Sequence, residues 1–121
     1  MIVEDEADTR EMLGEGLHTY GASVITAASA AEGLEQLMEH KPDLLVSDIG
    51  MPDMDGYDFL LKIRSEFPEE SRIPAVALTA YADAEHKDKS LRAGYDAHIA
   101  KPVTIADLVS VLAELASRKR L

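Results

Sequence analysis

The stretch LLVSDIGMPDMDG, residues 44–56, decides the fold of this chain. Its first three residues form a continuous apolar run, which is typical of a strand buried on both faces of a sheet. The run stops at Asp48, and the two glycines and the proline that follow disfavour regular structure. Asp48 is therefore expected at the carboxyl end of a core strand, where open α/β sheets place their sites.

The composition is that of one globular domain. The chain has 121 residues, 46% hydrophobic and 29% charged, and is long enough to bury a core without disulfides. We therefore expect a single domain over residues 1–121. The sequence has neither an apolar run long enough to cross a bilayer nor the pattern of a leader peptide. We expect a cytoplasmic domain that makes no membrane contact.

Charge and cysteine content restrict the partners. The net charge is -11, with 23 acidic against 12 basic residues, which disfavours binding to nucleic-acid phosphates. Basic residues cluster only at 118–120. We interpret them as stabilising the negative C-terminal end of a helix dipole and not as a nucleic-acid contact. We expect no direct nucleic-acid partner. Because there is no cysteine, any metal must be bound through oxygen or imidazole.

Strand and helix patterns alternate five times along the chain. Strands are expected at residues 2–3, 22–27, 44–48, 75–79 and 97–100, and helices at 7–20, 29–40, 57–67, 83–93 and 104–115. Strands separated by single helices require a parallel sheet with right-handed crossovers and helices on both faces. The predicted fold class is therefore α/β, a doubly wound (βα)5 unit.

The apolar spacing predicts which helix positions face the core. The predicted inward positions are Leu13, Leu17 and Tyr20 in the first helix, Leu34, Leu37 and Met38 in the second, and Ile105, Leu108, Leu112 and Leu115 in the last. The fourth helix offers only Ala84, Lys87, Ser90 and Leu91, so we expect it to be weakly packed. We interpret Met12, Met38, Met51 and Met54 as packing residues, and His18, His40 and His86 as surface residues.

Polar side chains follow the carboxyl ends of four strands. They are Glu4, Asp5, Asp48, Thr79 and Lys101, and the parallel topology brings these ends to one edge of the sheet. Three neighbouring carboxylates would repel one another unless a cation neutralised them. Mg²⁺ suits such a site, since it takes oxygen ligands and keeps several waters.

A chemical role follows for each member of this group. Asp5 and Asp48 suit direct Mg²⁺ ligation, the carbonyl of Gly50 offers a further oxygen, and Glu4 suits a metal-bound water. Lys101 supplies a point charge for a phosphoryl oxygen, and Thr79 supplies a hydroxyl donor. A carboxylate nucleophile, a magnesium ion, a lysine and a hydroxyl together favour phosphoryl transfer to Asp48.

Four motifs in this order resemble the receiver domain of response regulators. They are Glu4-Asp5, Asp48 with the Met-Pro-Asp-Met-Asp-Gly of residues 51–56, Leu78-Thr79-Ala80, and Lys101-Pro102. The resemblance covers nearly the whole chain. It implies a flavodoxin-like three-layer sandwich of strand order 2-1-3-4-5, and a two-component or phosphorelay function rather than a metabolic enzyme.

The resemblance also implies the site. Asp48 is then the phosphoacceptor, Asp5 and the Gly50 carbonyl bind Mg²⁺, and Glu4 supports a coordinated water. Thr79 is the switch hydroxyl and Lys101 contacts the phosphoryl group. The bond between Lys101 and Pro102 is expected to be cis, since X-Pro bonds adopt cis at little cost.

Partners follow from the same resemblance. The phosphodonor is expected to be a histidine kinase or a histidine phosphotransfer domain. An output domain or partner protein would use the face formed by the fourth helix, the fifth strand and the fifth helix. The sequence motifs Asp-Ile-Gly-Met-Pro and His-x-x-Lys-Pro are similar to those of receiver domains attached to hybrid sensor histidine kinases.

One departure from the family pattern concerns the switch. The family usually has Tyr or Phe three residues before the lysine, whereas this chain has His98. His98 is therefore either a moving, titratable switch or an inert, partly buried histidine.

Two other functions remain open. A degenerate receiver would act only as an interaction surface without phosphorylation. An aspartyl-nucleophile phosphatase would share the sheet and the Mg²⁺, but such enzymes usually carry an acid where this chain has Gly50.

Overall fold

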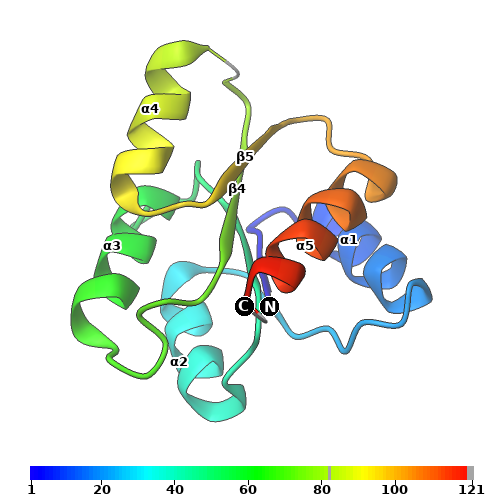
Figure 1. Cartoon of the computed structure of the whole chain (residues 1–121), viewed down its shortest axis with the longest axis horizontal. Coiled ribbons are helices and arrows are strands. Elements are labelled where there is room, and N and C mark those ends of the chain that lie inside the picture. Colours follow the sequence, from blue (N-terminus) through cyan, green and yellow to red (C-terminus); the bar gives the residue numbers. More distant parts are fainter. Residues whose placement is uncertain (82, 120–121) are drawn as a thin grey trace.

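A five-stranded parallel sheet forms the centre of the molecule, which the computed structural model describes over residues 1–81 and 83–119 (Figure 1). The strand order is β2-β1-β3-β4-β5. The strands are β1 (Ile2–Val3), β2 (Thr26–Ala27), β3 (Leu45–Asp48), β4 (Ala75–Thr79) and β5 (Ala97–Ala100). The predicted fold class and strand order are confirmed.

Five helices cover the two faces of this sheet. They are α1 (Ala7–Thr19), α2 (Ala30–His40), α3 (Gly56–Glu66), α4 (Ala84–Ala93) and α5 (Ile105–Lys119). Figure 1 shows α1 and α5 on one side of the sheet and α2, α3 and α4 on the other. No helix within the described ranges has the length and apolarity needed to cross a membrane.

The two faces of the sheet bury separate apolar clusters. In β3, Leu45 belongs to the cluster that contains Leu37 and Phe59, whereas the next residue, Val46, belongs to the one that contains Leu13. All four residues of β3 are buried, as the apolar run predicts. Each large apolar side chain buried in this way contributes about 1.5–3 kcal/mol to folding. The strand that carries Asp48 is therefore fixed from both sides.

Side-chain caps define the start of several helices. Ser29 Oγ accepts a hydrogen bond from the backbone N of Glu32 at 3.1 Å, and the Glu32 carboxylate accepts one from Ala28 N at 3.2 Å. Thr104 Oγ1 accepts from Asp107 N at 3.2 Å. These caps satisfy donors that the first helical turn leaves free. The predicted starts of α2 and α5 are confirmed.

The second strand is shorter than predicted. The sequence predicts a strand over residues 22–27, but β2 begins at Thr26. Its partner β1 supplies two ladder residues, with Ile2 opposite Thr26 and Val3 opposite Ala27. β-Branched residues give the preceding segment strand propensity, but a strand also needs a paired neighbour.

Six side chains that were expected to pack inside lie at the surface, namely Met12, Tyr20, Met38, Ala84, Lys87 and Leu91. The large apolar ones among them, Met12, Tyr20, Met38 and Leu91, each remain between 45% and 64% exposed. Tyr20 is the C-cap of α1 and lies beyond its last inward turn. In α4 the buried residues are Ser90 and Ala93, so the helix turns Leu91 outward. The predictions for these six residues are wrong. Met12, Met38 and Leu91 each lie beside the residue that the helix buries, whereas Ala84 and Lys87 lie on turns of α4 that bury no side chain.

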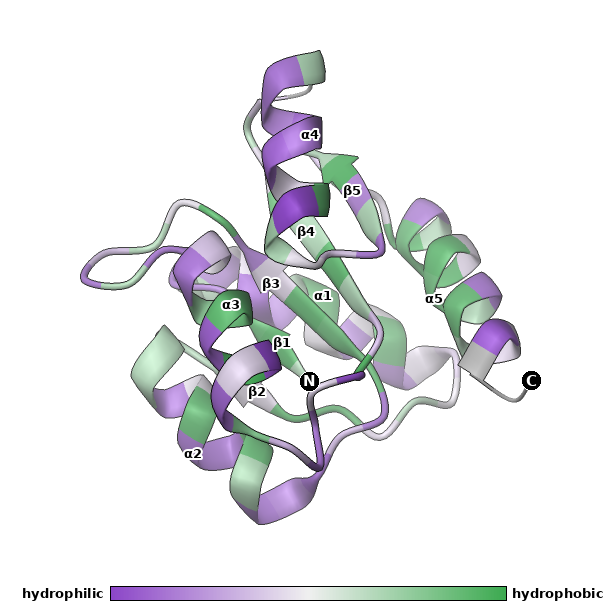
Figure 2. Cartoon of the chain, turned by 60° about the vertical axis from the view of Figure 1, so that its left-hand side comes forward, coloured by the Kyte–Doolittle hydropathy of each residue, from purple (hydrophilic) through white to green (hydrophobic). Residues whose placement is uncertain are grey.

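The helix α4 buries only small side chains. Its buried residues in the described range are Ser90 and Ala93, whereas the two buried residues of α1, Leu13 and Leu17, are both leucines. Figure 2 shows α4 as a mainly hydrophilic helix beside β4 and β5. The predicted weak packing is confirmed. At the end of α5, Arg118 pairs with Glu114, while Arg120 of the predicted basic tail lies outside the described residues.

Candidate functional site

The loop after β3 fixes the position of Asp48. Backbone nitrogens of Met51 and Gly56 both donate to the carbonyl of Ile49, at 3.0 and 2.8 Å. The Tyr95 hydroxyl donates to the carbonyl of Gly56 at 2.7 Å, which ties the loop to the segment before β5. Asp48 is therefore held on a rigid strand end next to a tightly bonded turn.

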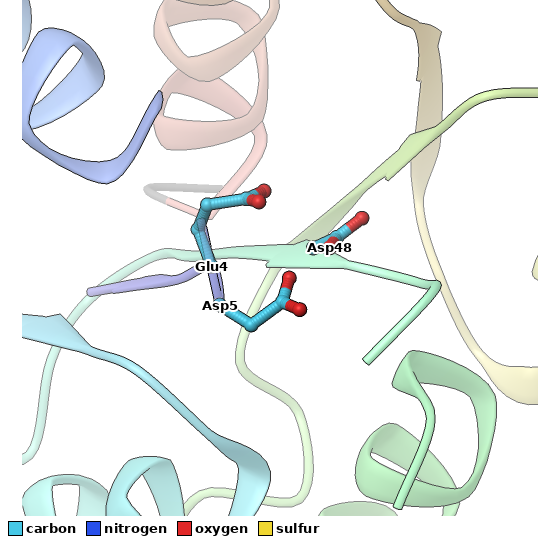
Figure 3. Close-up of side chains that lie close together, drawn as sticks. All are labelled: Glu4, Asp5 and Asp48. Atoms are coloured by element: carbon cyan, nitrogen blue, oxygen red, sulfur yellow. The ribbon is translucent and has the colours of Figure 1, made fainter. Parts of the chain in front are cut away.

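Three carboxylates meet at this end of the sheet (Figure 3). Glu4, Asp5 and Asp48 each offer one oxygen, and these oxygens lie within 4.8 Å of one another. Glu4 and Asp48 are buried, whereas Asp5 is exposed. The number and spacing of the oxygens fit a divalent cation that keeps part of its water shell.

Lys101 is the cation of this cluster. Its Nζ lies 3.0 Å from Asp48 Oδ1 and 3.3 Å from Glu4 Oε2. Its backbone N donates to the carbonyl of Thr79 at 2.7 Å, and the bond to Pro102 is cis. Burial disfavours the charged amine, but Asp48 and Glu4 outweigh burial and raise the pKa of Lys101. The cis bond implied by the resemblance is confirmed.

The buried carboxylates have perturbed pKa values. Burial raises the pKa of Glu4, with a further rise from the charge of Asp48, while Lys101 acts in the opposite direction. Burial also raises the pKa of Asp48, and Asp5 adds to this rise against the effect of Lys101. One lysine therefore does not neutralise the cluster, and a bound cation would relieve the remaining repulsion.

The cluster opens into a cavity of about 380 Å³. All six residues predicted to bind metal or phosphoryl groups line it: Glu4, Asp5, Asp48, Gly50, Thr79 and Lys101. The predicted meeting of four strand ends is thus observed, while the chemical role of each residue stays a prediction.

Five further lining residues with polar groups were missed, namely Glu6, Tyr57, Tyr81, His86 and Lys89. The Lys89 amine lies 4.6 Å from the centroid of the Tyr57 ring. His86 and Lys89 are three positions apart on α4, a spacing that puts both on one helix face. The sequence signal that could have identified these two residues is their spacing on the helix that follows the Thr79 strand.

The two predicted switch residues have different surroundings. Thr79 is buried at the end of β4, and its hydroxyl accepts a hydrogen bond from Tyr81 N at 3.0 Å. His98 lies outside the cavity lining, with Nδ1 3.4 Å from Ser90 Oγ. Its buried Nε2 has no hydrogen-bond partner among the described residues. Burial lowers the pKa of His98, so the neutral ring is favoured in the fold.

We expect His98→Phe to stabilise the fold by about 1 kcal/mol at neutral pH, because it removes a buried, unpaired ring nitrogen. The difference should grow as pH falls. The pKa of His98 is lowered in the fold, so below about pH 6.5 the unfolded chain binds the proton first and the wild type loses stability. Urea unfolding at several pH values measures this. A smaller advantage for His98→Phe at low pH would contradict it, and His18→Gln, at an exposed position of α1, is the control.

Comparison with known proteins places these residues in a family context. Residues 1–113 match the family model described as response regulator receiver domain. An uncharacterized 14.6 kDa protein of Leptolyngbya boryana is 40% identical over 112 residues, which are 93% of this chain and 85% of that protein. The sensor histidine kinase RcsC of Salmonella typhi is 35% identical over 120 residues, 99% of this chain but 12% of the kinase.

Solved structures include the same architecture. A putative response regulator from Chloroflexus aurantiacus has a TM-score of 0.89 and 33% identity, with 96% of this chain and 94% of that chain covered. The agreement in fold therefore covers nearly the whole chain.

Proposed function

This chain belongs to the response regulator receiver domain family, and from that premise we propose that it accepts a phosphoryl group on Asp48 in a two-component or phosphorelay pathway. The donor is the phosphohistidine of a histidine kinase or a histidine phosphotransfer domain, in the cytoplasm. The observation that carries the proposal is the contact of Lys101 Nζ with Asp48 Oδ1 at 3.0 Å inside a cavity lined by acids.

The transfer step follows from the positions of these groups. An Asp48 oxygen attacks phosphorus, the bond from phosphorus to the donor nitrogen breaks, and the imidazole leaves with the electron pair. Lys101 can release one of its two carboxylates and contact a phosphoryl oxygen instead. Burial of Asp48 keeps water from competing for these charges.

The acidic cluster fits the Mg²⁺ that such a reaction requires. Asp5, Asp48 and the Gly50 carbonyl would hold the ion, and Glu4 would hold a coordinated water. The ion would neutralise charge on the phosphoryl oxygens. The excess negative charge of Glu4 and Asp48, expressed in their raised pKa values, supports this assignment.

The response would pass to the face formed by α4, β5 and α5. Thr79 can turn its hydroxyl from Tyr81 N to a phosphoryl oxygen, and His98 links β5 to Ser90 on α4. Weakly packed elements move at the least cost in free energy, and the two residues that α4 buries, Ser90 and Ala93, are both small. An output domain or partner protein would read the new position of α4.

The proposal is tested by incubating the chain with acetyl phosphate and following its intact mass. We expect one added phosphoryl group in the presence of Mg²⁺ and none after chelation with EDTA, because the acidic cluster cannot accept a dianion without a cation. Amide NMR shifts at Asp5 and Asp48 on Mg²⁺ addition provide the binding control. An interaction module without phosphorylation predicts an unchanged mass, and a phosphatase predicts continued phosphate release from a generic phosphoester.

A further inference from the structure

The start of α4 carries a histidine held on two sides. His86 Nδ1 lies 2.6 Å from Asp83 Oδ1, and the backbone N of His86 donates to the same oxygen at 2.9 Å. The ring of His86 stacks on the ring of Tyr81, with 4.5 Å between centroids and 19° between planes. The imidazole is therefore fixed in one orientation by a carboxylate and an aromatic face.

This histidine belongs to the wall of the phosphoacceptor cavity. His86 and Tyr81 line the same cavity as Asp48 and Lys101, although they come from the segment after β4. About a third of the His86 side chain, 34%, is exposed, so water reaches the ring. Across the cavity, a Cβ added at Gly50 would meet nothing within 4 Å, so this side leaves room for a water.

The hydrogen bond to Asp83 determines which ring nitrogen carries the proton. Hydrogen bonds from the backbone and ring of His86 lower the pKa of Asp83, which is therefore a carboxylate at neutral pH. A carboxylate only accepts, so Nδ1 must donate, and the neutral ring then has its lone pair on Nε2. No hydrogen bond joins Nε2 to another described residue. The arrangement is that of a base oriented by a carboxylate.

We propose that His86, oriented by Asp83, is the general base for hydrolysis of the aspartyl phosphate and so determines how long the signal lasts. The proposal rests on the proposed function. The oxygen of a water forms a bond to phosphorus while its proton passes to His86 Nε2. The bond from phosphorus to the Asp48 oxygen breaks, and the electron pair stays on Asp48. The products are the free Asp48 carboxylate, inorganic phosphate and an imidazolium that returns its proton to solvent.

A capping role alone does not account for this arrangement. Asp83 caps α4 by accepting from the backbone N of His86, which any residue at position 86 would provide. The second bond, to the ring nitrogen, serves only the imidazole. Besides Asp83, His98 on β5 interacts electrostatically with His86. The charged and titratable residues that line the cavity together with His86 are Glu4, Asp5, Glu6, Asp48, Tyr57, Tyr81, Lys89 and Lys101.

The test compares the lifetime of the phosphorylated chain with and without the base. Wild type, His86→Gln and Asp83→Asn are phosphorylated with acetyl phosphate and Mg²⁺, the donor is removed, and loss of the phosphoryl mass is followed over time at neutral pH. The rate should fall roughly 10-fold to 100-fold in His86→Gln. Asp83→Asn keeps the cap and should give an intermediate rate.

Two further measurements separate a chemical role from a structural one. Free imidazole should restore hydrolysis in His86→Ala in proportion to its concentration, which a loss of packing would not allow. The ¹⁵N shifts of the His86 ring in the unphosphorylated wild type should indicate a proton on Nδ1 and none on Nε2.

Each outcome bears on the proposal. Equal lifetimes in wild type and His86→Gln, no rescue by imidazole, or the opposite tautomer would overturn it while leaving phosphorylation of Asp48 intact. If the wild type takes up no phosphoryl group, the proposed function fails, and the role of His86 fails with it. His18→Gln on α1, outside the cavity lining, should match the wild type throughout.

Discussion

Asp48→Asn is expected to abolish phosphoryl uptake completely and to make the folded chain more stable. The amide of Asn has no ionised oxygen to attack phosphorus, so no acyl phosphate can form. Burial and the charge of Asp5 raise the pKa of Asp48 above its ordinary value despite Lys101, which means that the ionised carboxylate costs free energy in the fold. Replacement by a neutral side chain of similar shape removes that cost.

The gain in stability should depend on pH. Because the folded pKa of Asp48 is raised, the wild type loses stability as pH rises from about 3.9 through the folded pKa. Asp48→Asn should therefore gain roughly 1 kcal/mol at neutral pH, or about 4 °C in melting temperature for a domain of this size. The difference should shrink in acid.

Thermal unfolding monitored by circular dichroism, together with intact mass after acetyl phosphate treatment, measures both effects. Asp53→Asn is the matched control, because Asp53 lies on the same loop with φ +67, a conformation that Asn tolerates. This control should retain phosphoryl uptake and wild-type stability. Phosphoryl mass on Asp48→Asn would place the acceptor elsewhere and remove the basis of the proposed function.

Gly56→Ala is expected to be the most destabilising change in the loop, at about 3 kcal/mol. A Cβ at this position would lie 2.7 Å from the Cα of Ile49 and in direct collision with the carbonyl oxygen of Asp48. Both atoms belong to the backbone, so no side-chain rotation can relieve the clash. The strand end that carries Asp48 would have to move, and we expect phosphoryl uptake to slow as well.

Gly14→Ala in α1 is the matched control for this substitution. Its Cβ would make ordinary contacts, at 3.6 Å to Thr26 and 3.7 Å to Val24. Alanine is the better helix former by about 0.5–1 kcal/mol, so Gly14→Ala should be neutral or stabilising. Urea unfolding of both variants measures the two free energies of unfolding. A free energy of unfolding for Gly56→Ala close to that of Gly14→Ala would show that the loop accommodates a side chain.

The sequence predicts the central part of the site because topology alone determines it. Asp48 and Lys101 follow different strands, and in a parallel sheet their carboxyl ends must share one edge. The apolar runs of β3 and β4 are specific enough to identify those strands without coordinates. The structure places the two side chains at that edge, with Lys101 Nζ 3.0 Å from Asp48 Oδ1.

The cavity wall and the helix faces were harder to predict for a different reason. Tyr57 and His86 line the cavity because of the tilt and rotation of α3 and α4 against the sheet, which depend on packing rather than on the order of elements. Met38 and Leu91 were assigned inward by spacing, but each lies next to the residue that the helix buries. The apolar spacing of an amphipathic helix does not distinguish the buried position from the position next to it.

The sparse burial of α4 has an evolutionary consequence. Substitutions in a helix with only two interior positions, Ser90 and Ala93, carry little penalty for folding, so its outward residues are free to diverge. Gene duplicates of this chain could acquire new partners by drift on α4 while β3 and β4 stay unchanged. The residues that select a partner would then lie on α4, where substitutions cost little folding stability.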